Sequence, residues 1–173
     1  GKTGVEQSAP AGATRTARET DVEPIVSLSA VNRRILKDLN VFWKPHAEAD
    51  ERFGSWMRRS LTLTDRDMFV SEGNSALEGY AISQPATPLH FPPAHEISGI
   101  GVIDDYYHHA FRDADALDDK DSRALDLFAA AEGALAGRGN EGCIVVCPAA
   151  WTSKIALLEQ AGYATAIVWY LKT

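Results

Sequence analysis

The segment from residue 100 to residue 163 constrains the fold more than any other part of the chain. It predicts, in order, a strand, an acidic loop, an alanine-rich helix, a continuously apolar strand over residues 143–147 and a short helix closed by Gly162. An unbroken apolar strand is typical of one that is covered on both faces and runs parallel to a neighbour. In such a sheet the carboxyl end of the first strand is the usual site for a small ligand. We therefore expect the loop after that strand to contribute to a binding site.

The residues before this segment predict helices followed by an antiparallel hairpin. Residues 20–40 have the pattern of a capping box and then one apolar stripe at helical spacing, which predicts a helix that serves packing. A second predicted helix over residues 48–60 carries Phe53, Trp56 and Met57 on one face, which packs in the core or lines a substrate cleft. Further strands are predicted over residues 14–17, 67–71, 77–82 and 164–171.

The chain is long enough for one domain and too short for two comfortable ones, with 173 residues of which 45% are hydrophobic. Residues 1–13 have no apolar period, which predicts a flexible N-terminal tail before a single domain over residues 14–173. No apolar run approaches the roughly 20 residues of a membrane span, and the first residues lack the apolar core of a signal peptide. We therefore expect a cytoplasmic protein that does not act at a membrane.

The charge of the chain argues against nucleic acid as a partner. The formal net charge is −7 and the isoelectric point is near 5.2, whereas phosphate binding needs a surplus of lysine and arginine. Cys143 and Cys147 would lie about 13 Å apart on a strand, too far for a disulfide, so we expect free thiols in the core. A small-molecule ligand in a reducing compartment fits these observations.

Three short sequence patterns resemble known ligand sites, but each lacks a feature that such a site requires. Residues 137–142 have the Gly-x-Gly-x-x-Gly spacing of a dinucleotide site, but they follow a helix and precede a strand, the reverse of the required context. The aspartate-rich loop from Asp113 lacks the sixth-position Gly and the twelfth-position Glu of a calcium loop. His108 and His109 have no third ligand at helical or turn spacing. We expect no metal.

The order of the elements resembles that of the GNAT (N-acetyltransferase) superfamily over nearly all of the chain from Thr14. The resemblance rests on an opening strand and helix over residues 14–28, on Ile103-Asp-Asp-Tyr-Tyr107, on an alanine-rich helix ending in Gly137-Arg-Gly139, and on Lys154-Ile-Ala-Leu-Leu-Glu-Gln-Ala-Gly162-Tyr163. It implies an α/β (α+β) fold with a mixed, twisted sheet of about six to seven strands, flanked by about four helices and splayed between the fourth and fifth strands.

By this resemblance, acetyl-CoA is the co-substrate and enters the splay between those two strands. Its pantetheine would pair with the backbone of Tyr107, His108 and His109, and its pyrophosphate would meet the following loop and the start of the next helix. The binding residues expected there are Asp119, Lys120, Ser122 and Arg123.

The pyrophosphate loop departs from the family pattern, which is Arg or Gln, two residues, Gly, one residue, and Gly or Ala. Residues 117–122 read Leu-Asp-Asp-Lys-Asp-Ser, without either glycine, so the helix amides, Lys120 and Arg123 would have to hold the phosphates. The family positions often filled by Asn and by a Tyr acid are Trp151 and Leu158 here.

Acetyl transfer to an amine needs a base for the amine and an acid for the leaving thiolate. Asp105 is the preferred base because it lies on the strand whose end would border the thioester, with His108 as the alternative. Tyr107 or Tyr106 would serve as the acid. Each has a structural alternative: a capped or solvated carboxylate for Asp105, core packing for the tyrosines and a surface position for His108.

Two functions therefore follow from the sequence. The first is an acyl-CoA-dependent N-acetyltransferase that acts on a small amine, and the acidic loop and negative net charge of the chain favour a cationic acceptor. The second is a catalytically impaired GNAT-fold module for ligand binding or interaction, since fold does not decide function. The open edges of the expected sheet also suit a homodimer.

Overall fold

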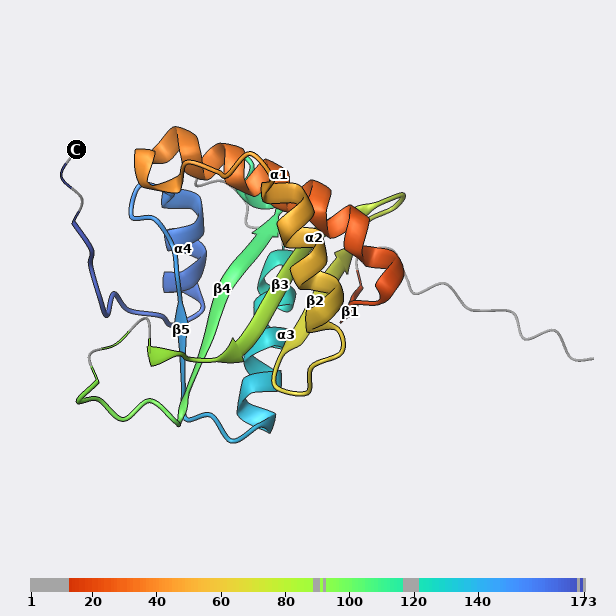
Figure 1. Cartoon of the computed structure of the whole chain (residues 1–173). Helices are drawn as coiled ribbons and strands as arrows, with labels where there is room; N and C mark the ends of the chain where they lie inside the picture. Colours follow the sequence, from red (N-terminus) through yellow and green to blue (C-terminus); the bar gives the residue numbers. More distant parts are fainter. Residues whose placement is uncertain (1–12, 89–90, 92, 117–121, 171, 173) are drawn as a thin grey trace, which may run out of the picture.

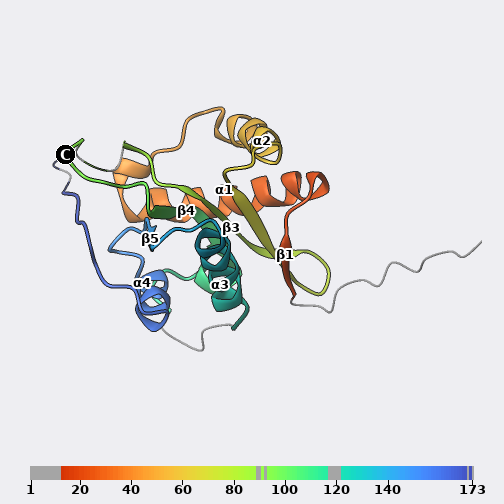
Figure 2. The ribbon, with the colours of Figure 1, turned by 90° about the horizontal axis from the view of Figure 1, so that it is seen from below.

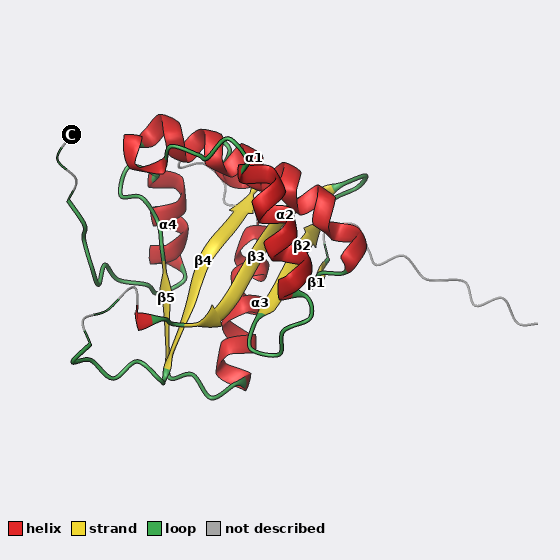
Figure 3. Cartoon of the chain, in the orientation of Figure 1, coloured by secondary structure: helices red, strands yellow, loops and turns green. Residues whose placement is uncertain are grey.

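The computed structural model describes residues 13–88, 91, 93–116, 122–170 and 172. Within them, one mixed sheet of five strands and four α-helices confirm the α/β fold class (Figure 3). The strands are β1 (Thr14–Thr16), β2 (Asp67–Glu72), β3 (Leu77–Pro85), β4 (Ile100–His108) and β5 (Gly142–Val145). The helices are α1 (Val22–Leu39), α2 (Ala49–Ser60), α3 (Ser122–Gly137) and α4 (Thr152–Gln160), with 3-10 turns η1 (Glu19–Asp21), η2 (Val41–Trp43) and η4 (His109–Phe111).

The sheet lies between two layers of helices. Its order is β1-β2-β3-β4-β5, antiparallel throughout except for the parallel pair β4 and β5. Helices α1 and α2 cover one face, and α3 and α4 cover the other (Figures 1 and 2). A parallel pair needs a crossover connection, which α3 provides. None of the described helices is long and apolar enough to cross a membrane.

The strands β4 and β5 part at a defined point. Their pairing covers residues 100–103 of β4 and goes no further in the described structure. On the other edge of β4, Asp105 and Ile103 face successive residues of β3, which leaves Asp104 as an extra residue in a β-bulge. Since a bulge bends and twists its strand, the bulge at Asp104 lies where β4 turns away from β5.

The sheet has fewer strands than the resemblance implied. The strand predicted over residues 164–171 is wrong for residues 164–170, which pair with no strand of the described structure. The side chains from Ile167 to Tyr170 are between 50% and 94% exposed. Strand propensity measures how well residues fit a pleated, half-buried surface, and here the apolar run has no such surface. The edges are therefore β1 and β5, and the expected homodimer stays a prediction.

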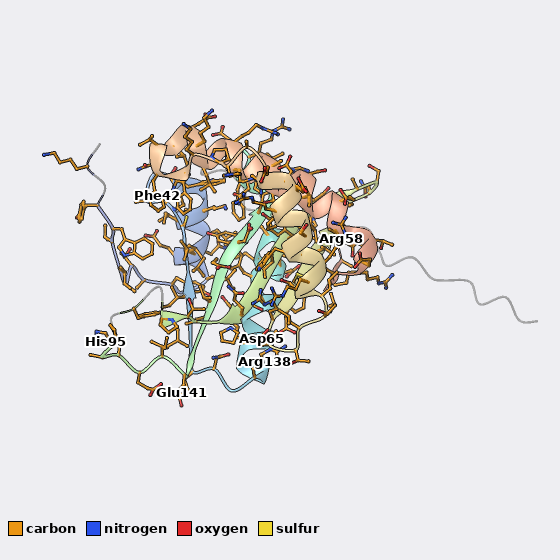
Figure 4. The ribbon with its side chains drawn as sticks, viewed as in Figure 1. Phe42, Arg58, Asp65, His95, Arg138 and Glu141 are labelled. Carbon is orange, nitrogen blue, oxygen red and sulfur yellow. The ribbon has the colours of Figure 1, made fainter. Side chains whose placement is uncertain are left out.

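Ion pairs join elements at the end of the molecule away from Phe42 (Figure 4). Arg138, just after α3, donates to both carboxylate oxygens of Asp67 on β2 at 2.7 and 3.0 Å, with Asp65 close by. Arg15 on β1 binds Asp21 at 2.7 Å and Glu72 at 2.5 Å. These contacts join β2 to the residue after α3, and β1 to η1 and β2.

Candidate active site

A cavity of about 490 Å³ lies between α1, α2 and the central strand β4. Its wall includes the rings of Trp43, Phe53 and Trp56, and the carboxylates Asp104 and Asp105 line it from the sheet. The other lining residues are Ser29, Asn32, Arg33, Leu36, Ala49 and Arg52. A concave, mostly apolar space of this size with a few polar groups is typical of a small-molecule site.

The two helices that cover the cavity contribute differently from what their sequence patterns predicted. The interpretation of α1 as packing alone was wrong, because its polar residues Ser29 and Asn32 are buried and line the cavity. In α2 the expected apolar face divides: Phe53 and Trp56 line the cavity, whereas Met57 is fully buried in the core. A helical stripe therefore identifies the inward face but not which part of it a ligand can reach.

Both arginines of the cavity wall are ion-paired. Arg33 binds Asp50 and also donates to the hydroxyl of Ser29 at 2.6 Å. Arg52 binds Glu48 at 3.0 Å, four residues earlier. Each guanidinium thus has a carboxylate partner, although the charge of Arg33 still favours the ionised form of Asp105.

Asp105 is the carboxylate best placed for chemistry. It is half-buried, and the hydroxyl of Tyr80 donates a hydrogen bond of 2.5 Å to one of its oxygens. Burial raises the pKa of Asp105 to about 6; the bond from Tyr80 opposes this rise, and the nearby charge of Asp104 adds to it. The carboxylate is therefore mostly ionised at neutral pH and still able to accept a proton, as a general base must be.

The bulge changes which side chains share a face of β4. Simple alternation would place Asp104 opposite Asp105, but both line the cavity. Beyond the bulge, the ring of Tyr106 meets Phe128 of α3 at a centroid distance of 4.7 Å, so this tyrosine packs in the core on the other face.

The remaining residues predicted for catalysis lie outside the cavity lining. Tyr107 is fully buried, its hydroxyl lies 3.5 Å from the ring nitrogen Nδ1 of His109, and burial raises its pKa. The surface alternative for His108 is wrong, since it is only 1% exposed. Its Nδ1 accepts a hydrogen bond from the amide of Ala110, and its Nε2 lies 3.4 Å from the hydroxyl of Ser71. Neither His108 nor Tyr107 is therefore among the residues that line the cavity with Asp105.

The residues predicted to hold the co-substrate lie beyond the end of β4. His109 is exposed and begins η4, and Ser122 is the first residue of α3. Arg123 forms an ion pair with Glu78 of β3. Asp119 and Lys120 lie outside the described residues. Among the described residues, no group of three or more His, Cys, Asp or Glu side chains is placed to hold a metal ion.

One charged residue of the site was missed by the sequence analysis. Lys154, in the first turn of α4, is only 3% exposed, and its ammonium donates to the carbonyl of Tyr106 at 2.9 Å and to Asn32 at 3.2 Å. The available signal was its place three and four residues before Leu157 and Leu158, which puts a lysine on the buried stripe of the helix.

Comparison with known proteins places this geometry in a known fold. No family model and no curated protein sequence matches the chain. A predicted acetyltransferase from Clostridium acetobutylicum, solved with acetyl-CoA, is similar at 15% identity over 93% of this chain and 95% of that one, with a TM-score of 0.65. The aminoglycoside N-acetyltransferase AAC(6')-Iy, solved with CoA, is similar at 12% identity over 97% and 99%, with a TM-score of 0.66.

A third similar structure is an aminoglycoside acetyltransferase from an uncultured soil metagenomic sample, in complex with sisomicin. It is 12% identical over 93% of this chain and 95% of that chain, with a TM-score of 0.59. At such identities the likeness shows the fold alone, which this chain shares with these acetyltransferases.

Proposed function

We propose that the protein is an acetyl-CoA-dependent N-acetyltransferase that acts on the amine of a small, cationic acceptor. The observation that carries this proposal is the position of Asp105. It lines a ligand-sized cavity and lies two residues beyond the last residue of β4 that pairs with β5. A base at this position would lie between an acceptor in the cavity and a thioester held where the strands part.

The cavity supports a cationic acceptor with an apolar body. Its three rings suit apolar groups and can attract a cation through their faces. Its arginines are ion-paired, whereas Asp104 and Asp105 present negative charge from the sheet. The aminoglycoside acetyltransferases of the same fold are consistent with an amine, although their identity to this chain is too low to name one.

The donor side supports acetyl-CoA through backbone rather than side chains. Beyond Ile103, the edge of β4 that faced β5 has no strand partner in the described structure, which leaves peptide groups for the amides of pantetheine. The start of α3 at Ser122 supplies helix amides for phosphate oxygens. These features fit the co-substrate, and the glycine-free loop would contribute less than in other members of the fold.

The chemistry assigned to Asp105 is proton removal. The acceptor loses its ammonium proton to solvent before reaction, and the neutral amine then gives one further proton to Asp105 as its nitrogen attacks the thioester carbonyl carbon. The carbon–sulfur bond then breaks, an amide forms, and the CoA sulfur leaves with the electron pair and needs one proton. Tyr80, which donates to Asp105, would hold the carboxylate in position.

Turnover of a small amine panel tests this function. The panel contains 2-phenylethylamine, tryptamine and 1,5-diaminopentane, with 3-phenylpropanol as the control that lacks an amine. We expect acetyl-CoA-dependent release of CoA and formation of the N-acetyl product with at least one cationic amine. Absence of product from every amine, with acetyl-CoA saturating, would contradict the proposal.

The second candidate is a GNAT-fold module that binds a ligand or partner without catalysis. The observation that favours it is the ion pair between Arg123 and Glu78, which engages a cation expected to meet the pyrophosphate. This function predicts that ligands of the cavity bind while acetyl-CoA does not. Binding of acetyl-CoA followed by acetylation of an amine would exclude it.

A further inference from the structure

Lys154 is a buried cation that the steps above do not use. The proton balance of those steps still lacks a group that gives a proton to the departing sulfur. Ammonium groups are rarely fully buried without a carboxylate partner. Here the two described hydrogen-bond partners of the ammonium are neutral oxygens, the carbonyl of Tyr106 and the side-chain amide of Asn32.

The ammonium lies at the point where the strands separate. Its partner, the carbonyl of Tyr106, belongs to β4 three residues beyond Ile103, the last residue that pairs with β5. Asn32, its second partner, also lines the acceptor cavity. Lys154 therefore reaches from α4 across the gap and connects the opening between the strands with the cavity that holds Asp105.

Aromatic rings surround the ammonium. It lies 3.9 Å from the centre of the Trp151 ring, 4.0 Å from that of Tyr106 and 5.7 Å from that of Phe111. Ring faces stabilise a cation without taking its proton. Burial lowers the pKa of Lys154 to about 7, while the nearby Cys147 and Asp105 act in the opposite direction. Its proton is thus easily given up near neutral pH.

We propose that Lys154 is the general acid that protonates the CoA sulfur as it leaves. This inference rests on the proposed acetyltransferase function. As the carbon–sulfur bond breaks, the electron pair stays on sulfur, the ammonium gives it one proton, and Lys154 becomes a neutral amine. Asp105 then holds the proton taken from the acceptor, and its transfer back to Lys154 restores both groups.

Lys154 lies on the same helix as the position at which the family often has a tyrosine acid. The family position often held by that tyrosine is Leu158 here, four residues after Lys154 and therefore on the same face of the helix, one turn away. The long side chain of a lysine, extending from the preceding turn, can bring its ammonium to the same region. An acid with a pKa near 7 is also well matched to a thiolate, whose thiol has a pKa of about 8.5.

Donors with different leaving groups test the inference in the intact protein. The assay measures acetylation of the best amine of the panel with acetyl-CoA and with 4-nitrophenyl thioacetate, whose thiolate leaves without a proton. The variants are Lys154→Gln, which keeps a neutral N–H donor for the Tyr106 carbonyl, and Lys154→Met, which removes the donor. Lys37→Met, at an exposed lysine of α1, is the charge-matched control.

General acid catalysis predicts a loss of about 10²- to 10⁴-fold with acetyl-CoA in both Lys154 variants and a loss below about tenfold with the nitrophenyl donor. Equal losses with both donors would show a structural role and overturn the inference, as would full activity with acetyl-CoA. If the unchanged protein acetylates no amine with either donor, the proposed function fails and this inference fails with it.

Discussion

The two sides of β4 differ in the chemical groups that they offer to a ligand. The side that faces α1 and α2 carries a cavity with three rings, two carboxylates and two arginines that are already ion-paired. The side that faces the gap toward β5 offers backbone groups, a helix start and Arg123, which is paired with Glu78. In the proposed function, side chains would thus define the acceptor site, whereas the donor site would depend mainly on the path of the backbone.

This difference predicts which substitutions should change the specificity and the catalytic rate. Changes at the acceptor side remove defined side-chain functions and should have large effects. Apart from Lys154, changes of side chains at the donor side should have small effects on the binding of the donor, because backbone amides remain when a side chain is replaced.

The largest effect is expected at Asp105. Asp105→Asn keeps a hydrogen-bond acceptor for Tyr80 but removes the base, so kcat/KM for amine acetylation should fall by about 10²- to 10⁴-fold. Asp104→Asn, in the same bulge and the same cavity, is the matched control and should lose less than about tenfold. Steady-state kinetics with one amine measures the loss of kcat/KM in each variant. Similar losses in the two variants would contradict the role of Asp105.

The pH dependence should reveal both ionisable groups of the site. Asp105 must be ionised and Lys154 protonated, so kcat/KM should rise toward a pH of about 6 and fall above about 7, by up to tenfold for each pH unit on either side. Cys147 and Tyr106 also face Lys154, but burial raises the pKa of both, so neither should titrate in this window. In Lys154→Met, kcat/KM should no longer fall above pH 7. If kcat/KM for the same amine still falls there, the fall is due to a group other than Lys154.

Stability should also depend on pH through Lys154. Its pKa is about 7 in the folded protein and 10.5 in an unperturbed lysine, so between these values the unfolded chain binds more protons. The free energy of unfolding should therefore rise with pH in this range, by up to about 1.4 kcal/mol for each pH unit. Urea unfolding of the wild type and Lys154→Met at pH 7, 8 and 9 measures this dependence. If the free energies of unfolding of the two proteins change with pH in parallel, the lowered pKa of Lys154 is contradicted.

The aromatic rings of the cavity should affect the binding of the acceptor amine but not the binding of acetyl-CoA. Trp43→Ala should raise KM for an aromatic amine by about tenfold, because a desolvated ring contributes roughly 1 to 2 kcal/mol to binding a cation or an apolar group. The affinity for acetyl-CoA should stay the same, since Trp43 lines the cavity and belongs to neither β4 nor β5. Calorimetry with acetyl-CoA is the control, and a joint loss of both affinities would mean that the two sides are not independent.

The smallest effect is expected on the donor side. Glu78→Gln would release Arg123 from its ion pair, and the affinity for CoA should rise by about two- to fivefold at low salt, in keeping with the modest energy of a partly exposed pair. Arg123→Ala should leave the affinity nearly unchanged in the wild-type background. A large loss in Arg123→Ala would show that this side chain binds the phosphates despite Glu78.

Much of the fold and one side of the site could be predicted from the sequence. The periodicity of residues 100–163 predicted β4, α3, β5 and α4 in order, and a carboxylate near the end of a strand identified Asp105 as a candidate. The final strand could not be predicted reliably because an apolar run such as residues 164–170 becomes a strand only beside a partner.

The rest of the site depends on long-range contacts that periodicity does not encode. Lys154 meets Tyr106 and Asn32, which are 48 and 122 residues away in the chain. The bulge at Asp104 depends on the register between β3 and β4, and it brings two successive carboxylates to one cavity. Local patterns predict which face of an element is buried, whereas only the packed structure shows which polar groups meet there.

Binding of acetyl-CoA to the purified protein distinguishes the proposed acetyltransferase from a module that binds no acetyl donor. Calorimetric titration with acetyl-CoA and with free CoA, at low and moderate salt, measures whether backbone amides and the start of α3 suffice without the glycines of the family loop. We predict saturable binding in the micromolar range that weakens with salt. The absence of detectable heat and of competition up to millimolar concentrations would contradict the acetyltransferase function.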